Sequence, residues 1–383
     1  MTNFDQIKVD FNIPTRIGNE IDYIRDAYDR RHISGDGYFT RQSSQYLQDY
    51  LGCSKVLLTT SCTHALEMSA LLLDIQPGDE VIVPSFTFVS TVNAFVLRGA
   101  KPVFIDIRPD TLNLDETLLA QKITDRTRAV VPVHYAGVGC EMDAILPLAA
   151  RNNIAVVEDD AHGLFGSYKG KKLGTFGQMA TLSFHETKNV TCGEGGALII
   201  NDPDLITRAE YIREKGTNRS RFFQGMIDKY TWVDIGSSYL PSDILGAVLY
   251  AQLEQHERIQ TKRQAVWDYY QANLQDWAAN HQVQLPTIPA GCQQSYHMFY
   301  MLLPTASDRS RMIAYLRENG IISVFHYLPL HLSDMGRRFG CQAGDCPVTE
   351  DISARLIRLP FHYHLDQSSQ DYVIEKLKAF KFD

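Results

Sequence analysis

The chain has 383 residues, 44% of them hydrophobic and 21% charged, and a formal net charge of -8. This length suffices for two domains with a large core, and the composition excludes the disordered and low-complexity classes. The negative charge argues against nucleic acid as the main partner. The N-terminal residues lack the apolar region of a signal peptide, and no apolar run approaches the roughly 20 residues of a membrane helix. We therefore expect a cytoplasmic protein with neither a nucleic-acid nor a membrane partner.

The seven cysteines are scattered along the chain without a C-x-x-C pair. An odd, dispersed set is typical of a reducing compartment rather than of a disulfide framework. Cys341 and Cys346 form the nearest pair, and no second pair follows to complete a metal site. We expect no metal centre.

Seven short apolar runs predict the strands of one sheet. They cover residues 56–60, 80–85, 101–107, 128–135, 154–159, 179–184 and 196–201. Runs this continuous are typical of strands that are covered on both faces. Helical patterns separate several of them, so we expect an α/β fold with a mostly parallel sheet. The interval 160–178 holds five glycines and no helical stripe, and that crossover is predicted to be irregular.

The pattern changes from about Ser242, where residues 242–270 predict one long helix opened by a Ser-Asp cap. After it, the sequence predicts a strand over 297–304, a helix over 308–320, a strand over 321–327 and a final amphipathic helix. We expect a large domain over residues 1–241, which includes the N-terminal segment. Residues 242–383 would form the bridging helix and a smaller α/β domain.

Polar and aromatic residues follow the predicted strands at their carboxyl ends, where ligands bind in open α/β sheets. Ser61, Cys62 and Thr63 follow the first strand and begin a helix, so their free N–H groups and hydroxyls form a candidate anion site. Phe88 follows the second strand. An ordinary helix cap and a core aromatic are the plain alternatives for these residues.

The fifth and sixth predicted strands lead into acidic and basic residues. Asp159 and Asp160 lie at the end of the fifth, where buried carboxylates need partners and solvated ones do not. Ser183, His185 and Lys188 come at the end of the sixth, and Lys188 alone would be an ordinary surface lysine. Together the four groups match the needs of pyridoxal phosphate. Its phosphate needs hydrogen-bond donors, and its ring needs a flat neighbour. Its pyridine nitrogen needs an acidic partner, and its aldehyde needs a lysine amine.

A set of longer motifs points to a family. The chain carries, in order, GDGYFTR, SCTHAL, PGDEVIVPSFTFVST, PVHYAG, VVEDDAHG, SFHETKN, GEGGALI, SSYLPSD and HYLPLH. This set resembles the DegT/StrS-type sugar-nucleotide aminotransferases over essentially the whole chain. The resemblance implies a type I, aspartate-aminotransferase-like fold of pyridoxal-phosphate-dependent transferases, with a seven-stranded large domain and a smaller C-terminal α/β domain. It also implies a homodimer with shared active sites.

The resemblance assigns roles to individual residues. Lys188 would bond to the cofactor aldehyde and act as nucleophile, base and acid in turn. Asp159 would pair with the pyridine nitrogen, and Phe88 would stack on the ring. Three residues would hold the phosphate: Cys62, Thr63 and Ser183.

Three positions depart from the family pattern. Cys62 stands where glycine or alanine is common. His162 stands where many members have glutamine, and it would donate to the phenolic oxygen of the ring. Ser238 replaces the asparagine of a G-x-N-x-R motif that reaches the partner's phosphate.

The resemblance also implies the reaction. L-glutamate would supply the amino group, and the acceptor would be dTDP-4-keto-6-deoxy-D-glucose, aminated at C4 to the galacto product. This step would serve the synthesis of lipopolysaccharide or enterobacterial common antigen. The candidates for the sugar pocket are His185, Tyr135, His326 and His331, with packed structural residues as the alternative for each.

Other functions remain open at this point. The acceptor could be a 3-keto sugar or a sugar linked to UDP or GDP, and a non-catalytic sugar-nucleotide sensor would keep the pocket without the lysine. A nicotinamide oxidoreductase would need G-x-G-x-x-G after the first strand, and residues 59–66 contain no glycine. A related sugar dehydratase would carry histidine in place of Lys188.

Overall fold

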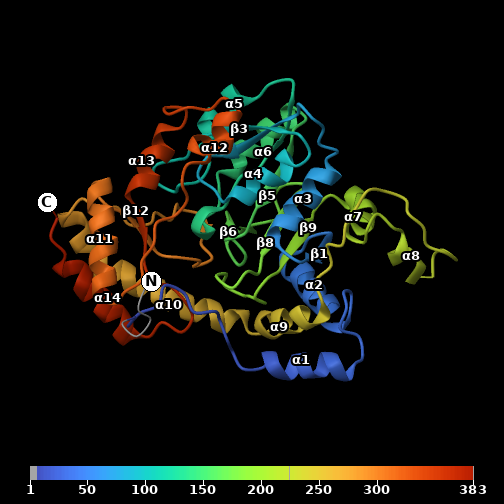
Figure 1. Cartoon of the computed structure of the whole chain (residues 1–383), viewed down its shortest axis with the longest axis horizontal. Coiled ribbons are helices and arrows are strands. Elements are labelled where there is room, and N and C mark those ends of the chain that lie inside the picture. Colours follow the sequence, from blue (N-terminus) through green and yellow to red (C-terminus); the bar gives the residue numbers. More distant parts are fainter. Residues whose placement is uncertain (1–6, 224, 383) are drawn as a thin grey trace.

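The computed structural model describes residues 7–223 and 225–382. A large body surrounds a seven-stranded sheet, and a smaller body is built on a two-stranded sheet (Figure 1). The order of the large sheet is β1-β9-β8-β5-β4-β2-β3. Its strands are β1 (Lys55–Thr59), β2 (Glu80–Pro84), β3 (Lys101–Ile105), β4 (Thr127–Val130), β5 (Ala155–Asp159), β8 (Met179–Ser183) and β9 (Gly196–Ile200).

All seven predicted strands are present, and the sheet is mostly parallel, as predicted. The exception is β9, which pairs antiparallel with both β1 and β8. A short loop without a helix joins β8 to β9, and such a connection can only reverse the chain. Because β9 separates them, β1 and β8 run in the same direction as β5. The carboxyl ends of these three strands therefore meet at one edge of the sheet.

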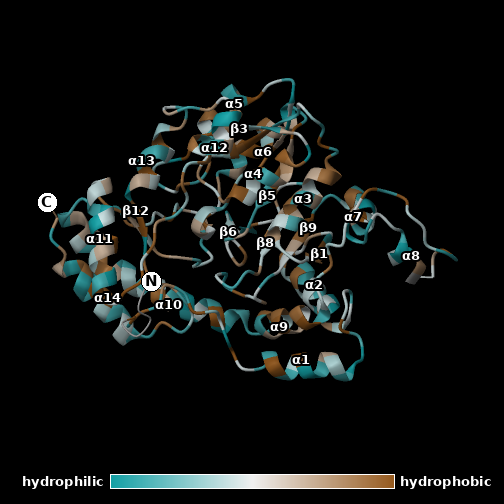
Figure 2. Cartoon of the chain, in the orientation of Figure 1, coloured by the Kyte–Doolittle hydropathy of each residue, from teal (hydrophilic) through white to brown (hydrophobic). Residues whose placement is uncertain are grey.

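Helices cover both faces of the sheet, which explains its continuous apolar strands. In β9, Leu198 and Ile200 pack with the first set of helices, while Ala197 and Ile199 pack with the second. The first set is α3 (Cys62–Leu72), α4 (Val89–Val96) and α7 (Ile206–Arg213). The second set is α2 (Tyr38–Leu51), α6 (Met142–Arg151) and α9 (Asp243–Leu253). Figure 2 shows brown, hydrophobic segments in α6 and α9.

The crossover between β5 and β8 is irregular, as predicted. It contains only two-residue strands, which join β10 from the C-terminal part in a small three-stranded sheet. These are β6 (Ser167–Tyr168), β7 (Lys171–Lys172) and β10 (Cys292–Gln293). The remaining short helices of the large body are α1 (Glu20–Asp29), α5 (Leu119–Lys122) and α8 (Arg219–Phe223).

The single long helix predicted from Ser242 is wrong, because the chain forms two helices. α9 ends at Leu253, and α10 (His256–Asn280) leads to the small body (Figure 1). α9 packs on α1 and α2, whereas α10 packs on the C-terminal helix, so the chain changes direction between them. Neither proline nor glycine marks this break in the sequence.

The small sheet also differs from the prediction. The expected strand over 297–304 forms as β11 (Tyr300–Leu302), which pairs with β12 (Leu356–Arg358), whereas the expected strand over 321–327 does not form. Those residues contribute only single bridges, from Ile321 to Val9 and from Val324 to Arg358. The small body consists of β11 (Tyr300–Leu302), β12 (Leu356–Arg358), α11 (Ala306–Glu318), α12 (Asp334–Arg338), α13 (Pro347–Arg355) and α14 (Gln367–Ala379).

The N-terminal segment reaches the small body. Val9 is buried in the same apolar cluster as Ile321 and Leu377, although the sequence placed this segment with the large domain. A domain boundary after residue 241 stays our proposal. None of the helices in the described part of the chain combines the length and the apolar character of a membrane span.

Candidate active site

A cavity of about 920 Å³ lies where the carboxyl edge of the large sheet faces the small body. The topology brings β1, β5 and β8 to this edge, so residues distant in sequence share one wall. The structure places these predicted residues on the wall: Cys62, Thr63, Phe88, Asp159, His162, Ser183, His185, Lys188 and His326.

Lys188 is held in the loop that joins β8 to β9. The base of this loop is closed by the Phe184 N–H, which donates to the Gly195 carbonyl at 2.8 Å, and the Lys188 N–H donates to the His185 carbonyl at 2.9 Å. Burial lowers the pKa of Lys188 to about 8, opposed by the negative charge of Asp159. A substantial part of the amine is therefore neutral at mildly alkaline pH, and a neutral amine is the form that attacks a carbonyl.

Asp159 ends β5 and is 4% exposed. Its carboxylate accepts a hydrogen bond from the Thr91 hydroxyl at 2.7 Å and one from the Ala161 N–H at 3.2 Å. Burial raises the pKa of Asp159 despite these donors and the nearby Lys188. A protonated pyridine nitrogen in the cavity would supply the positive partner that this buried carboxylate needs.

The start of α3 fits a phosphate. Ser61 caps the helix by accepting from the His64 N–H at 3.1 Å, and the N–H groups of Cys62 and Thr63 precede the first hydrogen-bonded turn. A Cβ atom on Gly196 would lie 2.4 Å from the Cys62 nitrogen, so only glycine lets β9 approach this helix start. Burial raises the pKa of the Cys62 thiol, which leaves it uncharged beside an anion.

Three hydroxyls complete this end of the cavity. Ser183 ends β8, and the Thr63 hydroxyl lies 2.8 Å from that of Ser90, which the sequence analysis did not single out. Free N–H groups, a helix N-terminus and three hydroxyls make a coherent anion cradle. The residues present therefore fit pyridoxal phosphate.

Three consecutive acidic residues have three different environments. Glu158 is buried and accepts N–H groups from Gly174, Phe176 and Gly177. Asp159 faces the cavity. Asp160 points into the core instead, and its two oxygens have no partner among the described residues. Burial, with the adjacent carboxylates, raises the pKa of Asp160 well above its usual value, so it is a neutral acid away from the site.

His162 is 6% exposed and stacks on His297, with the ring centroids 4.2 Å apart. Burial, together with the positive charges of Lys188 and Arg358, lowers the pKa of His162 well below its usual value. His162 is therefore neutral near pH 7, and it can contact a cofactor without adding charge to the site.

The structure separates the four candidates for the sugar pocket. His185 and His326 lie on the cavity wall. Tyr135 is fully buried behind the wall, where its hydroxyl lies 2.8 Å from His326 Nδ1. His331 is also fully buried, held by Ser85 at 2.6 Å and by Glu350 at 3.0 Å, and it joins β2 to the small body. Tyr135 and His331 thus have structural positions within this chain.

Ser238 does not reach the lysine cavity within one chain. It is exposed and lines a separate hollow together with Arg41, Arg213 and Lys215. A role for Ser238 at a phosphate therefore requires a second chain.

Sequence reasoning missed several residues on the wall, of which Arg358 is the most notable. It belongs to β12, a three-residue strand that was not predicted. Its guanidinium lies 4.9 Å from the Phe11 ring centre and donates to the Phe325 carbonyl at 3.4 Å. Its Nε is buried without a partner among the described residues, and the half-buried side chain lines the cavity as a cation.

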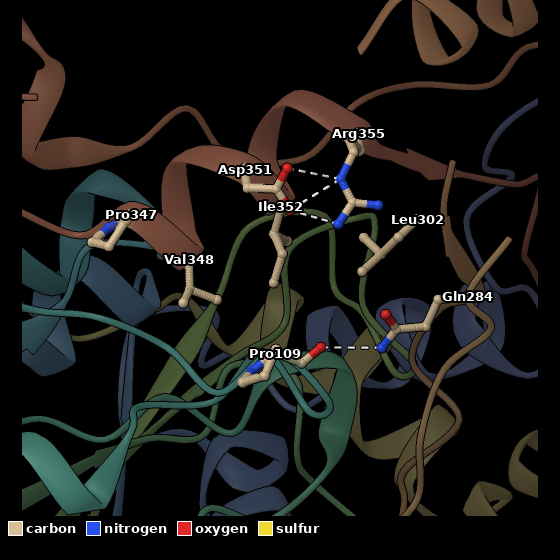
Figure 3. A pocket seen from close by; sticks show the side chains of 8 residues that line it. All are labelled: Pro109, Gln284, Leu302, Pro347, Val348, Asp351, Ile352 and Arg355. Carbon is tan, nitrogen blue, oxygen red and sulfur yellow. Dashed lines mark hydrogen bonds and ion pairs between the residues drawn. The ribbon is translucent and has the colours of Figure 1, made fainter. Parts of the chain in front are cut away.

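A second hollow between the two bodies lacks such chemistry (Figure 3). Asp351 and Arg355 pair with each other there at 3.0 Å, and the Gln284 amide donates to the Pro109 carbonyl at 3.0 Å. Its charged groups are already partnered. The described residues also contain no group of three His, Cys, Asp or Glu side chains suited to a metal ion.

Known proteins resemble this chain over most of its length. The family model for the DegT/DnrJ/EryC1/StrS aminotransferases matches residues 14–378. A GDP-perosamine synthase from Caulobacter vibrioides is 33% identical over 377 residues, covering 97% of this chain and 98% of the relative. A GDP-perosamine synthase from Escherichia coli O157:H7 is 30% identical over 371 residues, covering 97% and 98%.

Solved structures share the fold. A Streptococcus pneumoniae aminotransferase in its PLP form superposes with a TM-score of 0.89 at 27% identity, covering 97% of this chain and 98% of that one. The aminotransferase TlmJ from Streptoalloteichus hindustanus gives 0.88 at 29% identity, with the same coverage. The predicted type I fold and cofactor are confirmed. The chain belongs to the DegT/DnrJ/EryC1/StrS aminotransferase family and is a pyridoxal-phosphate-dependent aminotransferase.

Proposed function

We propose that this enzyme transfers an amino group from L-glutamate to a nucleotide-linked keto sugar, with Lys188 and Asp159 as its catalytic residues. The observation that carries the proposal is a half-buried lysine amine that shares one cavity with a buried carboxylate and a helix N-terminus. The acceptor must be a ketone, because an alcohol cannot condense with an amine.

Each residue has a defined task in this proposal. Bound pyridoxal phosphate supplies the electron sink for the chemistry. Asp159 keeps the pyridine nitrogen protonated, and Lys188 moves the proton at the α-carbon of the amino donor. Phe88, whose side chain is 57% exposed toward the cavity, offers a flat face to the ring. His162 hydrogen-bonds the phenolic oxygen of the ring as a neutral imidazole.

The amino donor matches the charge of the cavity. The described residues of the cavity wall include one lysine, Lys188, and one arginine, Arg358. With Lys188 engaged at the reacting carbon and the phosphate bound at α3, Arg358 is left for a carboxylate of glutamate. The aromatic and aliphatic surroundings of Arg358 reduce screening by water, which strengthens that ion pair.

We propose dTDP-4-keto-6-deoxy-D-glucose as the acceptor and dTDP-4-amino-4,6-dideoxy-D-galactose as the product, for synthesis of a surface polysaccharide. The support is the set of sequence motifs across the whole chain. A GDP-linked 4-keto sugar is the second candidate, because two relatives are named GDP-perosamine synthases.

The test is to supply purified enzyme and glutamate with dTDP-, UDP- and GDP-linked 4-keto sugars and a dTDP-linked 3-keto sugar. We expect the highest kcat/KM with the dTDP 4-keto sugar and an axial C4 amine by product NMR. Preference for the GDP sugar would transfer the assignment to the second candidate. An enzyme that aminates none of these ketones would contradict the sugar-aminotransferase proposal.

A further inference from the structure

For two histidines on the cavity wall, a hydrogen bond to a buried residue determines which ring nitrogen carries the proton. His297 and His326 are 8% and 7% exposed, and both line the lysine cavity. In each ring Nδ1 is hydrogen-bonded to a buried residue outside the cavity lining, while no described residue bonds to Nε2. Which Nε2 atom carries a proton decides what each ring can bind.

The tautomer of His297 follows from an amide. Its Nδ1 lies 3.0 Å from Asn189 Oδ1, and Asn189 Nδ2 donates to the Ser295 carbonyl at 2.6 Å. A flipped amide would set its oxygen against the Ser295 carbonyl oxygen, so the orientation of the amide is determined. Oδ1 can only accept, and therefore His297 Nδ1 carries the proton. In the neutral ring, Nε2 is then a hydrogen-bond acceptor.

The tautomer of His326 is the opposite one. Its Nδ1 lies 2.8 Å from the hydroxyl of Tyr135, which is fully buried. No other described residue bonds to that hydroxyl, so the phenol O–H either donates a hydrogen bond to Nδ1 or has no acceptor. A buried donor without an acceptor costs about 1–3 kcal/mol. The phenol therefore donates, and His326 Nε2 carries a proton that it can give to a ligand.

Both rings are neutral, so His297 Nε2 remains an acceptor and His326 Nε2 remains a donor. Burial, with the charges of Lys188 and Arg358 among its neighbours, lowers the pKa of His297 and of His326 well below the usual value. The wall therefore presents one fixed acceptor and one fixed donor. The phosphate and the glutamate carboxylates accept hydrogen bonds only, so they cannot serve an acceptor nitrogen. The neutral hydroxyls of a hexose can serve both.

We propose that His297 and His326 select the sugar by opposite hydrogen bonds: His297 accepts from one sugar hydroxyl, and His326 donates to another sugar oxygen. This inference rests on the proposed function and names two specificity residues for it. Tyr135 is a positioning residue, because it fixes the proton of His326 without touching the ligand.

The test measures binding without turnover. The holoenzyme with its cofactor in the aldehyde form has no amino group to transfer, so calorimetry can measure the Kd of the keto sugar nucleotide. We expect His297→Phe and His326→Phe to weaken binding about 10- to 100-fold each. His326→Gln, which keeps an N–H donor, should recover part of the loss, and Tyr135→Phe should weaken binding less than His326→Phe. The exposed His364→Phe is the matched control.

Analogues of the sugar make the test specific. The penalty of His297→Phe should vanish with the one monodeoxy analogue that lacks its hydroxyl partner, as in a double-mutant cycle. The rate of amino transfer from glutamate alone to the cofactor should fall by a smaller factor than the affinity for the sugar, because no sugar is involved in that half-reaction.

If the wild-type enzyme binds the keto sugar and both phenylalanine variants bind it equally well, this inference is overturned. The proposed function would remain intact. Equal losses in the glutamate half-reaction would also overturn it, because the histidines would then act on the cofactor. A wild type that binds no keto sugar would overturn both proposals.

Discussion

At the residue scale, the chemistry depends on which of two adjacent aspartates faces the cavity. Asp159 lines it, and Asp160 points into the core. We predict that Asp159→Asn nearly abolishes turnover, because an amide does not keep the pyridine nitrogen protonated. The variant should fold, since a lost charge-assisted hydrogen bond costs about 1.5–3 kcal/mol. Steady-state kinetics and thermal unfolding measure the two effects.

Asp160→Asn is the matched control for that experiment. The side chain is a buried neutral acid, and an amide has nearly the same shape, so activity should stay close to that of wild type. If Asp160→Asn were crippling and Asp159→Asn mild, the assignment would be off by one residue.

Lys188 gives a pH dependence at the same scale. Burial lowers the pKa of Lys188 from 10.5 to about 8, so between these values the unfolded chain binds more protons than the folded one. The lysine is therefore destabilising below about pH 8, and this contribution fades as pH rises toward 10.5. In the cofactor-free protein we expect Lys188→Met to be about 1–3 kcal/mol more stable than wild type at pH 7.

The comparison across pH isolates this effect from packing. Packing changes caused by methionine do not titrate, whereas the charge contribution does. Urea unfolding of both proteins at pH 7 and at pH 10 should show a smaller difference at the higher pH. A difference independent of pH would mean that Lys188 has an ordinary pKa in the folded protein.

Several residues of the cavity wall were predictable from the sequence, but among those of the small body His326 was predicted whereas Arg358 and His297 were missed. Lys188, Asp159 and Cys62 could be found because each follows a strongly apolar strand, and parallel strands bring their ends together. Arg358 and His297 could not, because they lie in or beside short strands that carry no clear alternation. Their chemistry becomes visible only when the small body is placed against the large sheet.

At the scale of elements, the buried strands were predictable and the helix break was not. Strands covered on both faces must be apolar throughout, and that pattern is local. The break between α9 and α10 depends on which body each helix packs against, which no local residue encodes. Residues 321–327 have strand-forming composition, yet Phe325, His326 and Tyr327 line the cavity instead of pairing in a sheet.

A buried aspartate couples two of these helices. Asp243, in the first turn of α9, accepts the N–H groups of Phe39 at 3.2 Å and of Thr40 at 2.7 Å, at the start of α2. It also accepts from the Thr40 hydroxyl at 2.9 Å. We expect Asp243→Ala to lower the free energy of unfolding by about 2–4 kcal/mol, because it leaves these donors buried and unpaired.

Asp243→Asn is the informative partner variant. Its remaining oxygen can still accept from the Thr40 N–H and hydroxyl, but its NH2 group cannot accept from the Phe39 N–H, so its loss should lie between that of alanine and wild type. Urea unfolding measures both. Equal stability of Asp243→Ala and wild type would show that α2 does not need this contact.

At the scale of the whole molecule, one chain exposes surface that a second chain would cover. The segment that carries α8 extends from the large body (Figure 1), and Trp232 beside it is 74% exposed. Met226, Tyr230 and Val233 are also exposed on this segment. Apolar patches of this kind mark interaction sites. We propose a homodimer in which Ser238 of one chain completes the phosphate site of the other.

Mixing two inactive variants tests the shared site. Lys188→Ala and Ser238→Asp should each be inactive alone. After dissociation and random reassociation, half of the dimers are hybrids with one intact site of two, so activity should return to about a quarter of wild type. No recovery, or a fully active monomer in sedimentation, would contradict the shared site.

The central claim is that Lys188 bonds to the cofactor. Holoenzyme treated with borohydride, which fixes the cofactor to the amine that holds it, should carry the label on a single peptide after digestion. We predict that this peptide contains Lys188 and that prior incubation with glutamate abolishes the labelling, because the cofactor then leaves the lysine as its amine form. A label on Lys172 or Lys215 in place of Lys188 would contradict the account.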